Sequence, residues 1–266
     1  MERELYVEVG ARRQRYLEAG SGWPLVLLHA FPLTADLWRP QLERAPRGWR
    51  LLAPDLRGFG PGVPPTSASL DEMAADVEAF LDAMEIDKAV IGGLSMGGYV
   101  TMALYRRAPA RFTGLLLANT RPGPDSEDGR AARNAMMALV RTKGSRAVAD
   151  QMLPKLLGTT SQRARPQLAT LVRRLIEGNS PDGIAAAIAG LRDRPDSTAV
   201  LQGVSVPAMV IAGEEDAIIP VSESEAMAAA LARSQLVILP AAGHLSSLEV
   251  PDDFSEALGT FLQANL

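Results

Sequence analysis

One serine of this chain lies in a setting typical of a nucleophile. The pattern G-x-S-x-G occurs at residues 93–97, with Ser95 at its centre. An apolar run at 89–91 precedes it and a helical pattern at 99–105 follows it, which predicts a sharp turn between a strand and a helix. On such a turn the backbone is strained and the serine hydroxyl projects outward, where it can attack a substrate. A serine in an ordinary glycine-rich turn is the alternative.

A serine hydroxyl needs a base to remove its proton, and imidazole is the usual base near neutral pH. The chain has only two histidines, His29 and His244. His244 lies in a loop after the last strand-like run, and loops at the carboxyl ends of parallel strands meet at one rim of the sheet. His29 ends an earlier apolar run, and we expect it to brace its loop through hydrogen bonds. We therefore predict that His244 is the base.

The base in turn needs a carboxylate that fixes its tautomer and stabilises its charged form. Three carboxylates compete for this role at residues 214–216, shortly after the apolar run at 208–211. We predict Asp216, because the apolar residues that follow it should turn its side chain inward. Glu214 and Glu215 are expected to stay solvated.

Acyl transfer also needs hydrogen-bond donors for the oxyanion that forms on the substrate. We predict the backbone N–H of Met96, directly after the serine, as one donor. The other donor is expected in the loop after the first central strand, and there we predict the N–H of Phe31. The Phe31 ring could contact substrate or form part of the pocket wall.

The elements that must position these residues alternate between strands and helices. Uninterrupted apolar runs, typical of strands covered on both faces, occur at 25–28, 51–53, 89–91, 115–117, 208–211 and 236–239. Alternating residues at 5–9 and a second segment at 12–17 predict an antiparallel pair at a sheet edge. Helix-start patterns occur at 69–72, 222–225 and 251–253. Together they predict an α/β fold with a mostly parallel sheet flanked by helices.

One interval breaks this alternation. From about residue 121 to residue 198 the apolar periodicity is helical throughout, and the strand pattern then resumes. We predict a helical cap (lid) at 121–198, inserted into a core domain formed by 1–120 and 199–266. A linker or an independent domain is the alternative.

Apolar side chains of the predicted cap are candidates for an acyl or alcohol pocket, because methionine adapts to varied shapes. At helical spacing such residues more often form the core of the cap itself. The candidates for substrate binding are Met136, Met137, Leu139, Met152 and Leu153.

Composition excludes several other classes of protein. The 266 residues hold no cysteine, which excludes disulfides, thiolate nucleophiles and cysteine-ligated metals, and two histidines are too few for a multi-histidine metal site. The net charge of −4 argues against a nucleic-acid partner. Neither an export leader nor an apolar run of membrane-spanning length is visible, so we expect a soluble cytoplasmic protein without a membrane partner. The sequence leaves the oligomeric state open.

Five motifs, in the right order, resemble those of the α/β-hydrolase superfamily. They are LHAFP at 28–32, APDLRGFG at 53–60, GLSMGG at 93–98, GEED at 213–216 and AGHL at 242–245. Within the superfamily the chain is similar to lid-bearing carboxylesterases and 3-oxoadipate enol-lactonase-like hydrolases. The resemblance implies an α/β-hydrolase fold with an eight-stranded sheet, and hydrolysis of a small-molecule ester or lactone without a cofactor or metal. It implies the roles given above for Ser95, Asp216, His244, Phe31 and Met96.

The predicted activity is therefore hydrolysis of small carboxylic esters or lactones through an acyl-enzyme on Ser95. Carbon–carbon bond hydrolysis of a diketone, perhydrolase chemistry and lyase chemistry on the same triad are alternatives. A non-catalytic ligand receptor that keeps the fold is an alternative of another class. A serine at the turn, where haloalkane dehalogenases and epoxide hydrolases carry aspartate, disfavours those two branches.

Overall fold

A computed structural model describes residues 2–10, 12–62 and 65–265. Within these ranges a central sheet contains eight strands in the order β1-β2-β4-β3-β5-β6-β7-β8. The strands are β1 (Arg3–Val9), β2 (Arg12–Gly20), β3 (Trp23–Leu28), β4 (Trp49–Pro54), β5 (Ala89–Leu94), β6 (Phe112–Ala118), β7 (Ala208–Gly213) and β8 (Ser234–Leu239). β2 runs antiparallel to β1 and β4, and the other neighbouring pairs are parallel. The predicted mostly parallel sheet with an antiparallel pair at its edge is confirmed.

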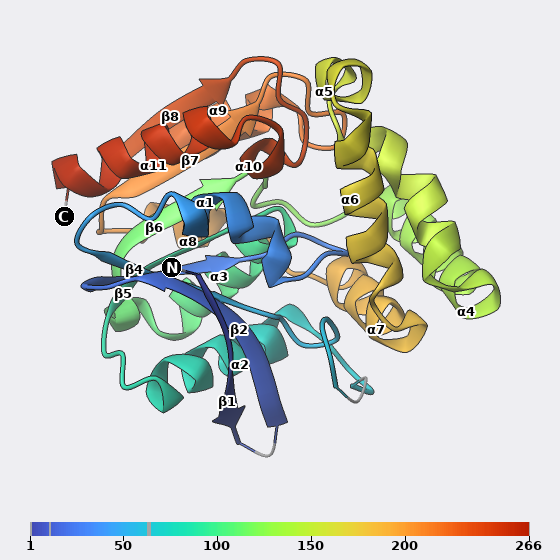
Figure 1. The fold of residues 1–266 in the computed structure, drawn as a ribbon, viewed down its shortest axis with the longest axis horizontal. Helices are drawn as coiled ribbons and strands as arrows, with labels where there is room; N and C mark the ends of the chain where they lie inside the picture. The colour runs from blue at the N-terminus through green and yellow to red at the C-terminus, as the bar shows by residue number, and fades with distance from the viewer. Residues whose placement is uncertain (1, 11, 63–64, 266) are drawn as a thin grey trace.

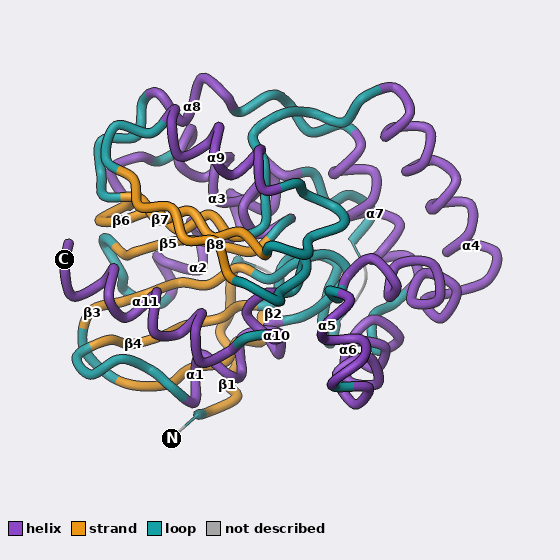
Figure 2. The backbone as a smooth tube through the Cα atoms, turned by 90° about the horizontal axis from the view of Figure 1, so that it is seen from above, coloured by secondary structure: helices purple, strands orange, loops and turns teal. Residues whose placement is uncertain are grey.

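Two layers of helices bury this sheet (Figure 2). One face carries α2 (Leu70–Ala83), α3 (Met96–Arg107), α8 (Thr198–Gln202) and α9 (Val221–Ala230). The other face carries α1 (Arg39–Glu43) and α11 (Pro251–Asn265), and three short elements lie in loops: η1 (Ala35–Trp38), η2 (Pro109–Arg111) and α10 (Ser246–Glu249). Because both faces are covered, every residue of β5 and β7 is buried. This explains why those strands are continuous apolar runs.

Two of the three helix-start patterns begin helices where the sequence predicts them. The Ser69 hydroxyl accepts the N–H of Glu72 and the Glu72 carboxylate accepts the N–H of Ser69, which completes a capping box before α2. α11 begins at Pro251. The third pattern also marks a helix, but its predicted capping residue was wrong: α9 begins at Val221, so Ser222 lies inside the first turn and is not the N-cap. Pro220, with its fixed φ of −57°, already supplies the boundary before that helix.

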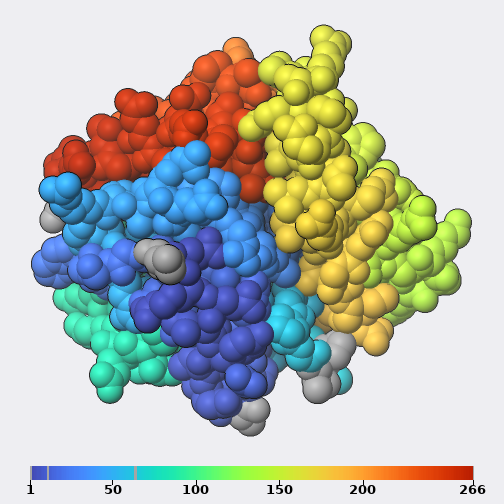
Figure 3. All heavy atoms as spheres, viewed as in Figure 1, coloured from blue at the N-terminus to red at the C-terminus, as the bar shows by residue number. Residues whose placement is uncertain are grey.

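Between β6 and α8 the chain forms helices α4 (Glu127–Leu156), α5 (Thr159–Ala164), α6 (Pro166–Glu177) and α7 (Pro181–Arg192). They lie together at one end of the sheet, on the right in Figure 1, and form one lobe of the surface in Figure 3. α4 is broken at Gly144, where φ is +76°. The predicted helical insertion between two strands is confirmed, while the domain boundaries at 121 and 198 stay a prediction.

The insertion shares a hydrophobic core with the sheet. Buried side chains of the cap, such as Val140 and Val172, belong to the same continuous cluster as Leu28 and Leu117 of the central strands. The cap is therefore packed onto the core. In the part of the chain that the structure describes, none of the helices combines the length and the apolar character that crossing a membrane requires.

Candidate active site

Ser95 lies on the tight turn between β5 and α3 and has φ 55° and ψ −110°. For a residue with a side chain this left-handed conformation is strained, and the surrounding structure has to hold it. Two backbone contacts do so: the N–H of Ser95 donates to the carbonyl of Ala118 at 2.9 Å, and the Thr120 hydroxyl donates to the carbonyl of Ser95 at 2.9 Å. The strand–turn–helix arrangement that the sequence predicts around Ser95 is present.

The turn can be this tight only because glycine occupies its flanks. A Cβ on Gly93 would lie 2.4 Å from the carbonyl carbon of Gly97. A Cβ on Gly97 would lie 2.1 Å from the carbonyl oxygen of Leu28, at the end of β3. The two glycines thus let the turn pack directly against helix α3 and the neighbouring strand.

His244 and Asp216 form a buried pair in the loops after β8 and β7. His244 Nδ1 lies 2.8 Å from Asp216 Oδ2 and 3.1 Å from Oδ1. The side chains are only 2% and 1% exposed, respectively. The contact directs the Nδ1 proton toward the carboxylate, so Nε2 is left as the basic nitrogen.

Further donors keep the Asp216 carboxylate charged. Oδ1 accepts the N–H groups of Ile218 at 2.8 Å and Ile219 at 3.0 Å. Burial opposes ionisation of Asp216, but His244 and these hydrogen bonds hold the pKa of its carboxyl below the ordinary value. A negative charge is therefore present beside the imidazole at neutral pH.

Asn119, directly after β6, is a site residue that the sequence analysis missed. Its Nδ2 donates to Asp216 Oδ2 at 2.9 Å and to the carbonyl of Gly243 at 3.2 Å. Its Oδ1 accepts the Ser246 hydroxyl at 2.6 Å. The only signal in the sequence was its place as a polar residue at the carboxyl end of an apolar run.

The end of β6 consequently anchors all three predicted catalytic segments. Ala118 and Thr120 hold the backbone of Ser95, while Asn119 between them holds Asp216 and the loop of His244. None of the hydrogen bonds among the described residues joins the Ser95 hydroxyl to His244. Such bonds are often long before substrate is bound and tighten in the reacting complex.

The predicted oxyanion donors belong to segments that touch each other. Phe31 follows β3, and the close approach of Gly97 to Leu28 brings the end of that strand against the turn that holds Met96. Within the described ranges, no hydrogen bond uses the backbone N–H of Phe31 or of Met96. The Phe31 ring packs edge-on against Phe59 with ring centroids 6.1 Å apart, and its contact with substrate or pocket stays a prediction.

His29 has the bracing role that the sequence predicts. Its Nε2 accepts the N–H of Leu56 at 2.9 Å, and its Nδ1 lies 3.0 Å from the carbonyl of Ala30. Burial lowers the pKa of His29 to about 4. Both ring nitrogens are used, so this side chain is not available as a base.

Both glutamates before Asp216 lie near the surface, as the sequence analysis expects, but Glu215 also forms hydrogen bonds with the cap that were not expected. Glu214 is exposed, and its carboxylate lies 3.4 Å from the N–H of Ala241. Glu215 instead accepts the N–H of Thr160 at 2.8 Å, its hydroxyl at 2.6 Å and the hydroxyl of Thr159 at 3.1 Å. The start of α5 lies over Glu215, a tertiary contact that local sequence does not reveal.

The predicted substrate-binding side chains of the cap belong largely to its packing. Met137 is 9% exposed and lies in the hydrophobic core, and Met136, Met152 and Leu153 pack against that core. Leu139 is half-buried. A role for these side chains in binding substrate stays a prediction.

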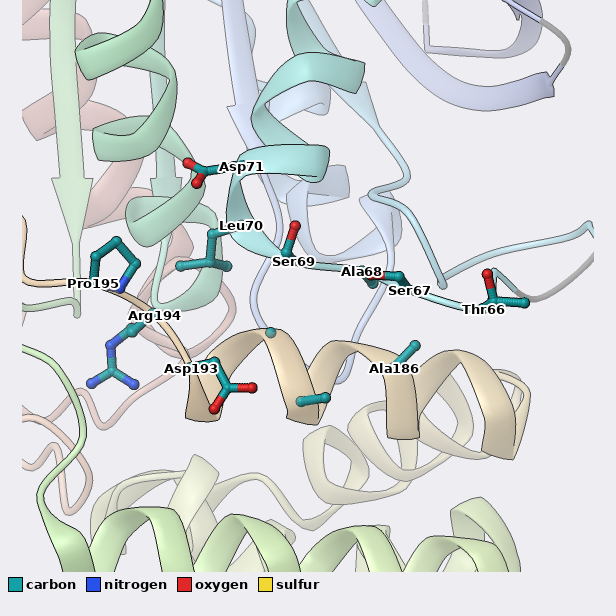
Figure 4. Close-up of a pocket in the computed structure, with 12 residues that line it drawn as sticks. Thr66, Ser67, Ala68, Ser69, Leu70, Asp71, Ala186, Asp193, Arg194 and Pro195 are labelled. Carbon is teal, nitrogen blue, oxygen red and sulfur yellow. The ribbon is translucent and has the colours of Figure 1, made fainter.

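A cavity of about 200 Å³ lies between cap helix α7 and the start of α2 (Figure 4). Its lining includes Ser69, Gly190 and Arg194 and none of the three predicted catalytic residues, so it marks the junction of cap and core. Among the described residues, no group of three or more His, Asp or Glu side chains could hold a metal ion.

Comparison with known proteins agrees with this fold. A family model described as alpha/beta hydrolase fold matches residues 24–251. The structure of a thermophilic esterase from Thermogutta terrifontis matches with a TM-score of 0.93 at 36% identity, covering 98% of this chain and 98% of that chain. The chain is 27% identical to 3-oxoadipate enol-lactonase 1 of Acinetobacter baylyi over 234 residues, 86% of this chain and 84% of the relative. It is 29% identical to 2-hydroxymuconate semialdehyde hydrolase of Pseudomonas sp. (strain CF600) over 262 residues, 92% of this chain and 88% of the relative.

The family match covers the sheet from β3 to β8, the cap and the loops that carry Ser95, Asp216 and His244, while β1 and β2 precede it. The chain therefore belongs to the α/β-hydrolase family.

Proposed function

We propose that this protein is a serine hydrolase that cleaves small carboxylic esters or lactones through an acyl-enzyme intermediate. The observation that carries the proposal is the common anchoring of the Ser95 turn, Asp216 and the His244 loop on the end of β6. The similarity to an esterase and an enol-lactonase supports the choice of substrate class.

In the first half of the reaction, substrate lies between the rim of the sheet and the cap. His244 Nε2 removes the Ser95 proton as Oγ attacks the carbonyl carbon, and the N–H groups of Phe31 and Met96 donate to the oxyanion. The tetrahedral intermediate collapses when His244 returns the proton to the departing alkoxide. Alcohol leaves, and the acyl group stays on Ser95 as an ester.

The second half reverses the roles with water as the nucleophile. His244 removes a proton from water, the hydroxide attacks the acyl carbon, and the proton then passes to Ser95 Oγ as its bond to carbon breaks. A carboxylic acid leaves. Asp216 holds the Nδ1 proton of His244 throughout and stabilises the imidazolium that forms twice per cycle.

Carbon–carbon bond hydrolysis on the same triad is the second candidate, because the chain is also similar to a 2-hydroxymuconate semialdehyde hydrolase. A substrate panel separates the two candidates. We expect turnover of p-nitrophenyl acetate, p-nitrophenyl butyrate and simple lactones. Turnover of a vinylogous diketone alone would favour the second candidate.

Replacement of the nucleophile tests the proposal directly. We expect Ser95→Ala to lower kcat for p-nitrophenyl butyrate by more than about 10³-fold, because the variant has no hydroxyl to acylate. The unfolding temperature should stay close to that of the wild type. A fluorophosphonate probe should label the wild type at Ser95, as peptide mapping would show. Folded wild-type protein that is not labelled would favour the receptor alternative.

A second substitution tests which carboxylate serves the base. We expect Asp216→Asn to lower kcat by about 10³- to 10⁴-fold, because an amide at this position favours the wrong imidazole tautomer. Glu215→Gln should cost less than about tenfold, because Glu215 contacts the cap and not His244. Initial rates measured at saturating ester give the ranking, and the opposite order would assign the acid to Glu215.

A further inference from the structure

One short segment of the cap lies directly on the two loops that carry the predicted acid and base. It comprises residues 156–161, from the end of α4 into α5, and is called the brace below. The carbonyl of Leu156 accepts the N–H of Leu245 at 3.2 Å. A Cβ on Gly243 would lie 2.2 Å from the nitrogen of Gly158, so the two backbones are in van der Waals contact. Gly243 and Leu245 are the neighbours of His244 in the chain.

Glu249 ties the brace to the His244 loop from inside the protein. This residue is 3% exposed and the mechanism above does not use it. Its Oε2 accepts the N–H of Gly158 at 2.8 Å, and its Oε1 accepts the N–H of Leu245 at 3.1 Å. Burial raises the pKa of Glu249, while hydrogen bonds from the brace and from the His244 loop oppose that rise. A buried carboxylate is costly unless it is hydrogen-bonded, and here its partners come from the brace and from the His244 loop.

Glu215 ties the same segment to the loop of the acid from the outer side. Its carboxylate receives the N–H and hydroxyl of Thr160 and the hydroxyl of Thr159. The Thr160 hydroxyl contributes most to lowering the pKa of Glu215. Because Glu215 precedes Asp216 in the chain, a shift of the brace would be passed to the acid as well as to the base.

We propose that the brace positions the Asp216–His244 pair, and that Glu215 and Glu249 are the positioning residues through which it acts. The inference rests on the proposed hydrolase function, since it assigns a role relative to that triad. A displacement of reacting groups by about 1 Å can cost about 100-fold in rate, so contacts next to the acid and the base bear on kcat. Neither carboxylate touches the reacting atoms.

The test compares Glu249→Gln and Glu215→Gln with Glu214→Gln as the matched control. An amide keeps the volume but has only one acceptor oxygen, so in Glu249→Gln an NH₂ group faces a backbone N–H, whereas in Glu215→Gln the Thr160 hydroxyl can rotate to accept and the loss is smaller. We expect kcat for p-nitrophenyl butyrate to fall about tenfold in Glu249→Gln and about threefold in Glu215→Gln, with KM within about twofold of the wild type. Glu214→Gln should keep both constants. All assays are run well below the unfolding temperature of each variant.

A double-mutant cycle tests whether Glu215 acts through the brace. Thr160→Val removes the hydroxyl that lies 2.6 Å from Glu215 Oε1 and leaves the triad untouched. We expect it to lower kcat about as much as Glu215→Gln does, and the double variant to lose no more than either single variant. Glu215 and Thr160 lie near the surface, so we expect their variants to fold. The cycle therefore tests the proposal even if Glu249→Gln does not fold. Fully additive losses, or unchanged kcat in both variants, would overturn the proposal.

A readout without turnover separates this proposal from the hydrolase function. The proton shared by His244 and Asp216 should give a far-downfield proton NMR resonance. We expect Glu215→Gln and Glu249→Gln to shift or broaden it and Glu214→Gln to leave it unchanged. If the resonance shifts in Glu215→Gln and Glu249→Gln but the wild type hydrolyses no ester, the positioning role of the brace is supported and the hydrolase proposal is contradicted. If the wild type is active and the resonance is identical in all variants, the brace falls alone.

Discussion

The two histidines differ in role because their surroundings use their ring nitrogens differently. Both ring nitrogens of His29 form hydrogen bonds with backbone groups, and burial disfavours its charged form. In His244, among the contacts of the described residues, only Nδ1 is hydrogen-bonded, to the Asp216 carboxylate, so Nε2 is available to accept a proton. The same residue type thus serves once as a structural support and once as the proposed base.

His29 should make the stability of the protein depend on pH. Its pKa is about 4 in the folded state and about 6.5 in an unfolded chain, so its contribution is complete above about pH 6.5 and is lost as pH falls toward 4. The full loss is about 3 kcal/mol, of which about 2 kcal/mol falls between pH 7 and 5. Urea unfolding of the wild type and His29→Asn at both pH values checks this. Equal losses in both proteins would contradict it.

At the residue scale, the sequence analysis identified candidate residues whose type or pattern is rare in this chain. With two histidines and one G-x-S-x-G pattern, few combinations could form a triad. Asn119 and Glu249 escaped notice because an asparagine after a strand or a glutamate in a helix is common. Their roles depend on partners far away in the chain.

At the element scale, the proposed active site depends on how closely the Ser95 turn approaches β3. The clearance is set by Gly97, where a Cβ would lie 2.1 Å from the carbonyl oxygen of Leu28. That carbonyl belongs to strand backbone, which cannot give way as a side chain could. The spacing between the predicted oxyanion donors on Phe31 and Met96 follows from this contact.

Gly97→Ala should therefore damage both the fold and the activity. We expect the unfolding free energy to fall by about 2 kcal/mol or more through overpacking, and kcat to fall at least tenfold because the oxyanion donors move apart. Gly123→Ala is the matched control, since no atom lies within 4 Å of the added Cβ. Chemical denaturation and ester hydrolysis measure the two effects. A well-folded, fully active Gly97→Ala would show that the close approach is not required.

The sequence predicted the elements whose burial leaves a regular pattern of apolar residues. It missed elements that are too short to show such a pattern and that depend on tertiary contacts. The strands were visible because two helix layers force continuous apolar runs on them. Short elements such as η1 and α10 carry too few residues for a pattern. Ser222 was predicted to cap a helix, but α9 begins one residue earlier, directly after Pro220. A neighbouring proline can therefore set a helix boundary in place of a local capping pattern.

At the scale of the whole molecule, one buried ion pair joins the two connections between cap and core. Asp125 lies on the way into the cap and Arg194 on the way out, with 2.7 Å between Oδ1 and Nη1. Their side chains are 4% and 2% exposed, respectively. Arg194 also stacks over the Tyr99 ring of α3 at 4.4 Å, and Arg133 adds a second cation at 3.0 Å from Asp125.

Removing this carboxylate should loosen the junction. We expect Asp125→Asn to lower the unfolding free energy by about 3 kcal/mol, because Arg194 would keep a buried charge without its counter-ion. Asp150→Asn is the control: Asp150 pairs with Arg173 on the surface, with exposed fractions of 59% and 35%. That variant should cost less than about 1 kcal/mol. Similar losses in both variants, measured by urea titration, would contradict a special role for the buried pair.

The contacts of the brace limit which cap helices from related proteins could replace those of this chain. A chimaera that received the cap helices α4 to α7 from a relative would keep the sheet and the Ser95 turn. It would lose the donors that Gly158 and Thr160 offer to Glu249 and Glu215 unless the graft supplied equivalents. Exchanging these helices to alter substrate range would then also change the catalytic rate, and donor sequences would have to be chosen for both.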